Sequence, residues 1–328
     1  MGIVKIADDL HEEARIASKA MSRSINAQAE HWMKIGMLVE ANPNMSYTDA
    51  IQFLLAEVRQ LETSQAAGYE AKASRIMVKN ADEIEKMRVA GRLTARVLEA
   101  LDEVIAPGIS TLEIDQFCEN FIVNSLNAWP ASKGQYNYPF SINTSINHVV
   151  CHGMPSDKKL KKGDIVNVDV TVEKDGFIGD SSKMFCIGET SRSAKRLVDI
   201  TQQCLYKAIK IVKPGATLGD IGNVIQSHAE KNHYSIVREY TGHGIGREMH
   251  EKPQVLHFGK ANSGLVLEAG MTFTIEPMIN QGKRRVKTLS DGWTVVTADR
   301  RLSAQWEHTV LVTEKGCDVL TQRQGELI

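Results

Sequence analysis

The chain has 328 residues, and at ~150 residues per domain this length suggests about two domains. It carries 39 Lys and Arg residues against 40 Asp and Glu, a net charge of -1, and 42% of its residues are hydrophobic. This composition is ordinary for a globular protein, and it excludes a disordered chain, a collagen-like chain and a strongly cationic nucleic-acid coat protein.

Neither the apolar runs nor the cysteines indicate a membrane or secreted protein. No apolar run approaches the ~18–20 residues that span a bilayer, and the N-terminus lacks the apolar region of a signal peptide. The five cysteines are odd in number and form no CxxC pair, so a disulfide framework is not expected. We therefore expect a cytoplasmic protein without membrane contact.

The first part of the chain predicts a small, mostly helical module. Residues 3–6 form a short β-prone run, and helical patterns follow over about 9–21, about 25–41 and from Ser46 onward. Few large apolar side chains follow the third helix, which is typical of a linker. We predict three parts: a module over 1–62, a linker over 63–75 and a large domain over 76–328.

The large domain shows signs of an internal duplication. Two pairs of helical patterns each precede strands: 82–104 with 110–127, and 190–212 with 216–232. The second helix of each pair begins after a similar segment, which starts at Pro107 and again at Pro214, an offset of 106–107 residues. We expect duplicated α+β half-domains whose sheets face each other across a cleft.

Two aspartates are expected on one face of a hairpin. Residues 165–172 alternate between apolar and polar side chains, and an Asp-Gly pair at 175–176 predicts the turn. With that pair as the loop, Asp169 faces Ser182 and Asp180 is a diagonal neighbour; a one-residue shift would place the aspartates directly opposite. Both registers bring the carboxylates to ~5–8 Å. Their repulsion would be relieved by a divalent cation, although a polar sheet face with unrelated acids stays open.

Three further side chains extend this candidate metal site. His243 lies in a glycine-rich segment that predicts a turn, Glu276 ends a β-prone run before Pro277, and Glu307 lies in another strand-like run. With the two aspartates they provide four carboxylates and one imidazole. Such ligands suit Mn, Fe(II) or Co, and accept Zn. Four negative charges match two divalent metal ions, an arrangement used by aminopeptidases.

Several motifs occur in the order found in one peptidase family. They lie at residues 150–155 (VCHGMP), 242–247 (GHGIGR), 250–253 (HEKP), 274–278 (TIEPM) and 307–309 (EHT), together with the Asp169 and Asp180 hairpin. With these motifs, residues 76–325 resemble a type I methionine aminopeptidase of the pita-bread fold. The resemblance implies an α+β fold with pseudo-two-fold duplicated halves, preceded here by the small helical module.

The resemblance also implies roles for the metal ligands. Asp169 would bind one metal ion, His243 and Glu276 the other, and Asp180 and Glu307 would bridge the two. The metal pair would lower the pKa of a bridging water and polarise the scissile carbonyl. Glu276 is the expected proton acceptor for that water.

Two histidines and an apolar slot complete the implied site. His250 would donate a hydrogen bond to the developing oxyanion or the scissile amide. His152 would contact the substrate near the scissile bond and shuttle protons. Tyr138, Met249 and Trp293 are the expected walls of a slot for the methionine side chain.

Residues that depart from the family pattern, or lie outside it, lead to separate expectations. Asn143 stands where relatives commonly have Cys, and Met249 replaces the usual Phe, so we expect a substrate slot of altered shape or polarity that includes Asn143. Three other histidines, His228, His233 and His257, lie outside the matching motifs and are predicted to be surface or core residues.

The implied activity is metal-dependent removal of the N-terminal methionine from nascent proteins and peptides with a small second residue. The enzyme would meet nascent polypeptide N-termini near the ribosome. Two other functions stay open: an Xaa-Pro aminopeptidase or prolidase-like peptidase, and a non-catalytic protein that reuses the fold to bind DNA or protein. The presence of all five candidate ligands favours the enzyme.

The N-terminal module carries a second resemblance. Residues 1–60 resemble a ParD-like antitoxin segment of the ribbon-helix-helix kind, in which paired strands enter the major groove of DNA. Residues 1–75 hold eight Lys and Arg against ten Asp and Glu, so they lack the basic footprint of a DNA-binding protein. We expect dimerisation or protein docking before DNA binding, and a folded extension without a partner stays open.

Overall fold

The structure, a computed structural model, describes residues 76–328 and ten separate positions between residues 12 and 46. The chain divides into two compact units, Met1–Lys72 and Ala73–Ile328. The predicted strand at the N-terminus, the body of the third helix and the linker lie outside the described residues.

In the first unit, the described positions belong mainly to the first two predicted helices. Glu12, Glu13, Trp32 and Ile35 are helical, in agreement with helices over about 9–21 and 25–41. Ile35 is buried in this helix, while Trp32 is half-buried and Gly36 is exposed.

In the second unit, α-helices occur close to the four predicted ranges. They are α4 (Ala81–Ala100), α5 (Thr111–Asn120), α6 (Arg192–Ile209) and α7 (Leu218–Lys231). A π-helical turn, η1 (Phe121–Ser125), continues α5, and a 3-10 helix, η2 (Gln135–Asn137), follows. Asn80, Ser110 and Thr217 each form a capping box, which fixes the start of α4, α5 and α7 respectively.

The predicted hairpin is the centre of the first sheet. Its strands are β4 (Ile165–Lys174) and β5 (Phe177–Cys186), and the other edge of β4 pairs with β1 (Trp129–Pro130) and β2 (Ile142–Ile146). Asp169 pairs with Ser182, so the first predicted register is confirmed. The turn residues Asp175 and Gly176 both have positive φ angles, 52° and 75°, as the Asp-Gly pair predicts.

The remaining strands form three sheets. One has the order β15-β14-β9-β7-β8, the second β13-β10-β6 and the third β11-β12-β3. Their bounds are β3 (Val149–Cys151), β6 (Ser235–Ile236), β7 (Gly242–Gly244), β8 (Glu251–Val255), β9 (Thr272–Ile275), β10 (Met278–Asn280), β11 (Val286–Thr288), β12 (Val295–Thr297), β13 (Ser303–Gln305), β14 (His308–Val312) and β15 (Cys317–Val319).

Two sequence-based expectations about local structure were wrong. His243 lies in the short strand β7 and not in a turn, because β8 and β9 pair with it on either side. Glu307 does not lie within a strand: the run that contains it divides into β13 and β14, which join different sheets. The break turns the Glu307 side chain toward the hairpin, where its backbone N–H donates to Ser182 O at 3.3 Å.

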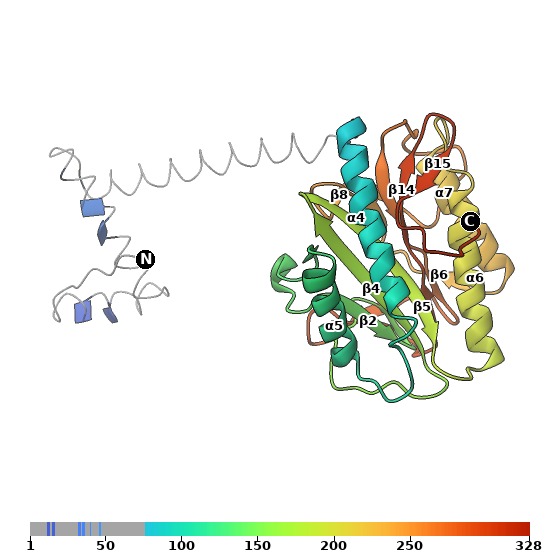
Figure 1. The fold of residues 1–328 in the computed structure, drawn as a ribbon, viewed down its shortest axis with the longest axis horizontal. Coiled ribbons are helices and arrows are strands. Elements are labelled where there is room, and N and C mark those ends of the chain that lie inside the picture. Colours follow the sequence, from blue (N-terminus) through green and yellow to red (C-terminus); the bar gives the residue numbers. More distant parts are fainter. Residues whose placement is uncertain are drawn as a thin grey trace. The chain divides into compact units, whose positions relative to one another are not determined.

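The predicted duplication is visible in the helix pairs and in their backbone hydrogen bonds. Helices α4 and α5 pack beside the β4–β5 sheet, while α6 and α7 pack together on the other half (Figure 1). Gly108 N donates to Leu160 O at 2.7 Å, and Gly215 N donates to Leu267 O at 3.0 Å. Donors and acceptors are both offset by 107 residues, since 215 - 108 = 267 - 160 = 107. The same backbone hydrogen bond therefore occurs at equivalent positions in the two halves.

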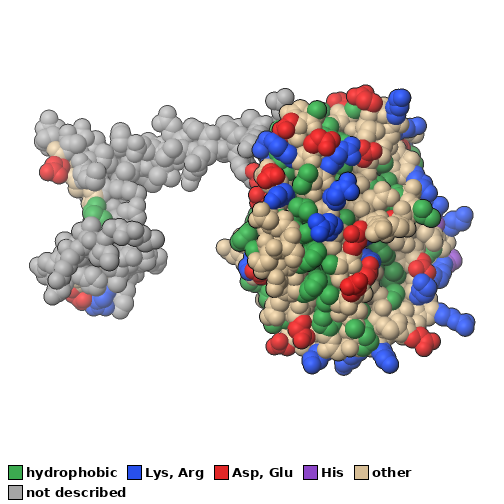
Figure 2. Space-filling model, viewed as in Figure 1, with side chains coloured by type: hydrophobic (Ala, Val, Ile, Leu, Met, Phe, Trp, Pro, Cys, Tyr) green, Lys and Arg blue, Asp and Glu red, His purple; other side chains and the backbone are tan. Residues whose placement is uncertain are grey.

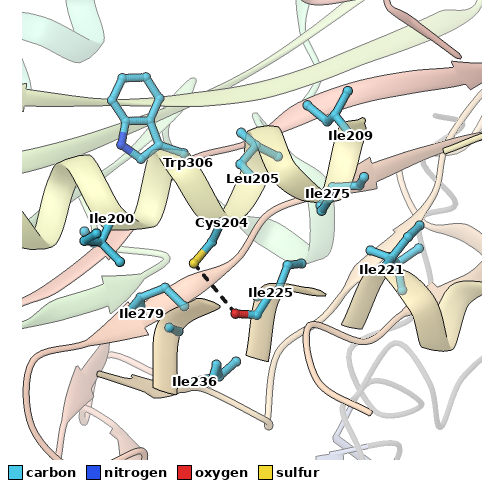
Figure 3. Packing of buried hydrophobic residues seen from close by; sticks show 14 of the residues in the cluster. Ile200, Cys204, Leu205, Ile209, Ile221, Ile225, Ile236, Ile275, Ile279 and Trp306 are labelled. Carbon is cyan, nitrogen blue, oxygen red and sulfur yellow. Dashed lines mark hydrogen bonds between the residues drawn. The ribbon is translucent and has the colours of Figure 1, made fainter. Parts of the chain in front are cut away.

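Each half has its own apolar core. The core beside α6 and α7 is rich in isoleucine and includes Ile200, Ile221 and Ile225 (Figure 3). Cys204 is part of it, and its thiol donates to Ile225 O at 3.8 Å. All five cysteines are free thiols, as expected. The second core lies between α4, α5 and the hairpin sheet.

The surface agrees with the near-zero net charge. On the face drawn in Figure 2, basic and acidic side chains are interspersed over the second unit. Within the part of the chain that the structure describes, no helix is both long enough and apolar enough to cross a membrane.

Candidate metal centre and active site

Three of the predicted ligands meet at the centre of the second unit. Asp180 on β5, His243 on β7 and Glu307 between β13 and β14 place one ligand atom each within 4.8 Å of one another. His243 Nε2 lies 3.8 Å from Asp180 Oδ2 and 3.6 Å from Glu276 Oε1. The carboxyl of Asp169 interacts with that of Asp180 across the hairpin. The fold thus brings together four carboxylates and one imidazole from five separate segments.

The imidazole of His243 is oriented for metal binding. Its Nδ1 lies 3.0 Å from Gly244 O, and donating a proton there leaves the Nε2 lone pair facing the carboxylates. Its backbone N–H donates to Thr274 Oγ1 at 3.0 Å. Gly242 permits this close strand pairing, because a Cβ there would lie 2.4 Å from Thr274 O. Burial lowers the pKa of His243 to about 3, so the ring is neutral, as a ligand must be.

Glu276 is fixed by three neighbours, one of which the sequence did not indicate. Thr274 Oγ1 donates to Oε1 at 3.0 Å and Gln305 Nε2 donates to Oε2 at 3.3 Å. The backbone N–H of Glu276 donates to His257 Nε2 at 3.2 Å. Burial lowers the pKa of His257 to about 3, so its ring is neutral and can accept this bond. His257, for which a surface or a core position was expected from sequence, is buried and also supports a candidate ligand.

The carboxylates repel one another in a site shielded from water. Burial, the largest cause, raises the pKa of Asp169 to about 7. The pKa values of Asp180, Glu276 and Glu307 are raised well above the usual range, by burial and then by neighbouring carboxylates. Asp180 Oδ1 is buried and has no hydrogen-bond partner among the described residues. Divalent cations would satisfy this oxygen and offset the repulsion, so the residues fit a metal centre.

A buried arginine supports the segment that carries Glu307. Arg323 Nη1 donates to Ser181 Oγ at 3.0 Å, and that hydroxyl donates to Glu307 O at 2.6 Å. The side chain of Arg323 is almost completely buried, and its positive charge opposes the rise in the Glu307 pKa. Because the arginine follows Ser181 by 142 residues, no local sequence pattern could have revealed this contact.

The two predicted catalytic histidines flank the metal ligands. The His250 ring centroid lies 4.4 Å from that of His243, in an edge-to-face arrangement. His152 has a positive φ of 55°, a conformation that non-glycine residues rarely adopt and that is found at functional sites. Its ring packs edge-to-face with Tyr240 at 5.4 Å. Burial and the nearby His250 lower the pKa of His152 to about 4, and burial also lowers the pKa of His250.

The structure brings together three of the four predicted slot residues. The rings of Tyr138 and Trp293 meet edge-to-face at 4.9 Å, and Tyr138 Oη donates to Ile142 O at 3.0 Å. Asn143 pairs directly with Asp169 in the β2–β4 ladder, which places it beside a metal ligand.

Met249, the fourth predicted slot residue, packs in a separate apolar cluster. It is buried in a group of side chains that includes Phe177 and Ile245. Its part in the substrate slot stays a prediction.

Comparisons with known proteins agree with this geometry. Residues 85–314 match metallopeptidase family M24, and residues 1–96 match the ParD-like antitoxin of type II bacterial toxin-antitoxin systems. The methionine aminopeptidase of Escherichia coli is 55% identical over 254 residues, which is 77% of this chain and 96% of the relative. The crystal structure of the Rickettsia prowazekii methionine aminopeptidase has a TM-score of 0.74 at 49% identity, covering 76% of this chain and all of that one.

A more distant likeness bears on the fold alone. The prolidase of Pyrococcus furiosus has a TM-score of 0.61 at 23% identity, over 77% of this chain and 67% of the prolidase. The duplicated α+β fold and the buried carboxylate–histidine centre define a metal-dependent hydrolase of the pita-bread architecture. The chain belongs to metallopeptidase family M24, and its catalytic unit is similar to methionine aminopeptidases over nearly their whole length.

Proposed function

We propose that this enzyme removes the N-terminal methionine from nascent proteins and peptides whose second residue is small. The observation that carries the proposal is the convergence of Asp180, His243 and Glu307 within a domain that is 55% identical to the Escherichia coli methionine aminopeptidase. The prolidase-like alternative is not favoured, since the prolidase likeness is limited to the fold. A non-catalytic role is not favoured either, because all five candidate ligands are present.

The proposed centre holds two divalent ions, drawn from Mn, Fe(II), Co and Zn. Asp169 would bind one ion, His243 and Glu276 the other, and Asp180 and Glu307 both. When bound, the ions would supply an acidified water and polarise the scissile carbonyl. The unpaired Asp180 Oδ1 and the raised pKa values of the carboxyls support this assignment.

The chain's own groups then move protons and orient the substrate. Glu276, held by Thr274 and Gln305, accepts a proton from the attacking water. His250 and His152 are neutral near pH 7, because their pKa values are lowered, and each has one ring N–H. His250 donates to the developing oxyanion or the scissile amide, and His152 contacts the substrate beside it.

The proposed methionine slot is walled by Tyr138 and Trp293, whose rings are in contact. Asn143 would add a polar group next to Asp169, and Met249 would shape the slot from the loop that carries His250. An unbranched thioether fits such a slot by apolar contact with the aromatic rings.

The first unit has a separate proposed role. Its match to a ParD-like antitoxin supports protein docking or dimerisation. DNA binding is less favoured, because acidic residues outnumber basic residues in this part of the chain. Nascent chains as substrates would place the enzyme in the cytoplasm, near the ribosome.

The activity is tested with metal-reconstituted full-length enzyme on a series of Met-Xaa peptides. We expect fast release of methionine when the second residue is Gly, Ala or Ser, and slow release when it is Leu or Phe. An Xaa-Pro peptide whose first residue is not methionine serves as the comparison substrate. Faster cleavage of Xaa-Pro than of Met-Ala would favour the prolidase-like function instead.

A further inference from the structure

The loop between β7 and β8 carries His250 and is closed by the carboxylate of Glu251. Glu251 Oε1 accepts hydrogen bonds from Arg247 N at 2.9 Å and from Glu248 N at 3.3 Å. Gly246 N also donates to Glu248 O at 3.1 Å. The residue next to His250 therefore organises the backbone of the whole loop.

The same carboxylate forms a buried ion pair with a lysine from the beginning of the second unit. Lys79 Nζ lies 2.5 Å from Glu251 Oε2, and the two side chains are only 4% and 10% exposed. The backbone of Lys79 is also fixed, since its N–H donates to Gly270 O at 2.8 Å. A Cβ at Gly246 would lie 2.6 Å from Lys79 Cε and from Glu251 Oε1, so the ion pair packs directly against this glycine.

The ring of His250 has few contacts of its own that could hold it. Its Nδ1 lies 3.5 Å from Gln135 Nε2, at the limit of a hydrogen bond. Its centroid lies 6.3 Å from the ring of Tyr136, which is exposed to solvent. The ring is 4.4 Å from His243. Its position therefore depends mainly on the backbone of the loop, and so on Glu251.

We propose that Lys79 is a positioning residue for His250, acting through the buried pair with Glu251. The inference rests on the proposed catalytic role of His250. Lys79 lies just before α4, at the beginning of the second unit. Without the lysine, the Glu251 carboxylate would turn toward water and the loop would shift. A displacement of ~1 Å at a reacting group can lower the rate ~100-fold.

The test compares Lys79→Met, His250→Ala and the double variant in the full-length, Mn-loaded enzyme, with kcat, KM and the Mn²⁺ dissociation constant measured for each. We expect Lys79→Met to lower kcat by about 10–100-fold and to leave the Mn²⁺ constant unchanged. In the His250→Ala background the same substitution should lower kcat no further, because its effect passes through His250. Lys195→Met is the matched control, since Lys195 forms an exposed pair with Asp199.

Each other outcome has a definite meaning. Three results would overturn the inference while leaving the role of His250 intact. They are a wild-type kcat in Lys79→Met, a further loss of kcat in the double variant, and a change in the Mn²⁺ dissociation constant that parallels the change in kcat. Wild-type kcat in His250→Ala would overturn that role and the inference with it. If Lys79→Met does not fold, Lys79→Met/Glu251→Met removes both charges and the acceptor oxygen, and leaves no unpaired buried carboxylate. That variant should fold and show the same loss of kcat, and wild-type kcat in it would equally overturn the inference.

Discussion

Asp169 and Asp180 interact across the β4–β5 hairpin, although neither is the direct ladder partner of the other. Asp169 pairs with Ser182 and Asp180 with Thr171, so the two carboxyls are diagonal neighbours on one face. Asp180 is buried and Asp169 is half-buried, and the pKa of each is raised, so two negative charges are unfavourable in the metal-free site. This relationship is the physical basis for the metal requirement.

Asp180→Asn should therefore weaken metal binding and abolish peptidase activity while leaving the fold intact. Loss of a carboxylate that is proposed to bridge the two ions would remove several kcal/mol of charge stabilisation, which corresponds to a fall in kcat/KM of at least about 10³-fold. Glu307→Gln should behave in the same way. Mn²⁺ titration calorimetry gives the number of bound ions, for which we expect two in the wild type. Asp199→Asn, at an exposed ion pair, is the control, and two tightly bound ions in either ligand variant would contradict the assignment.

The contribution of the buried carboxyls to the stability of the metal-free enzyme should fall as the pH rises. Their pKa values are raised in the folded state, so at these groups the folded protein binds more protons than the unfolded chain, and their contribution to the free energy of unfolding decreases with pH. This contribution is fully present below the unfolded pKa of about 4. It is lost as the pH rises through the folded pKa, about 7 for Asp169.

The measurement is thermal unfolding from about pH 5 to about pH 8, with the metal-free wild type compared with metal-free Asp180→Asn, which has the same buried histidines. The Tm of the wild type should decrease relative to that of the variant, by about 2–4 °C for each kcal/mol of carboxyl repulsion. The Tm of the Mn-loaded enzyme should decrease less, because the cations offset the repulsion. The Tm of Asp180→Asn, which has one carboxylate fewer, should also decrease less than that of the metal-free wild type. If the slope of Tm against pH is the same in all three samples, repulsion between the carboxylates does not explain the pH dependence.

Arg323→Met should weaken metal binding from outside the ligand set. The arginine supports Glu307 through the Ser181 hydroxyl and opposes the rise in its pKa. Loss of such an outer contact typically costs about 10–100-fold in metal affinity. Mn²⁺ titration measures this, with Arg88→Met, at a partly exposed pair with Asp318, as the control. An unchanged dissociation constant in a folded variant would show that the arginine serves only to pack the C-terminal segment.

Trp293→Ala should affect substrate binding more than the chemical step. The indole ring packs against Tyr138, and its removal opens the proposed methionine slot. Loss of about 1.5–3 kcal/mol of apolar contact corresponds to a rise in KM of about 10–100-fold for Met-Ala peptides, with a smaller change in kcat. Tyr138→Phe keeps the ring and removes only the bond to Ile142 O, so it should retain a near-normal KM. Equal KM values in wild type and Trp293→Ala would exclude the ring from the slot.

The sequence predicted those parts of the site that depend on local pattern or family motifs. The Asp-Gly turn fixed the register of Asp169, and the predicted ligand residues converge in the structure. It could not predict the strand at His243, because Gly-His-Gly has no strand propensity of its own and is held by its neighbours β8 and β9. Nor could it predict His257, Arg323 or the Lys79–Glu251 pair, since each contact joins residues far apart in the chain.

A fragment that begins at Ala73 should keep the peptidase activity. The Escherichia coli relative aligns over 96% of its own length with 77% of this chain, so the first unit has no counterpart there. We expect kcat/KM for Met-Ala peptides within about two-fold of the full chain, as for an independently folded domain. A gel-shift assay of residues 1–65 with DNA at low salt tests the other unit, and we expect no retardation. A large loss of activity in the fragment would mean that the first unit contributes to catalysis.

Mass spectrometry of a Met-Ala-Ser peptide during incubation with Mn-loaded full-length enzyme tests the metal-dependent removal of one methionine. We predict loss of a single methionine residue and no further shortening, with no reaction when Asp180→Asn replaces the wild type. An intact peptide with the metal-loaded wild type would contradict the proposed activity, and equal cleavage by Asp180→Asn would contradict the proposed metal site.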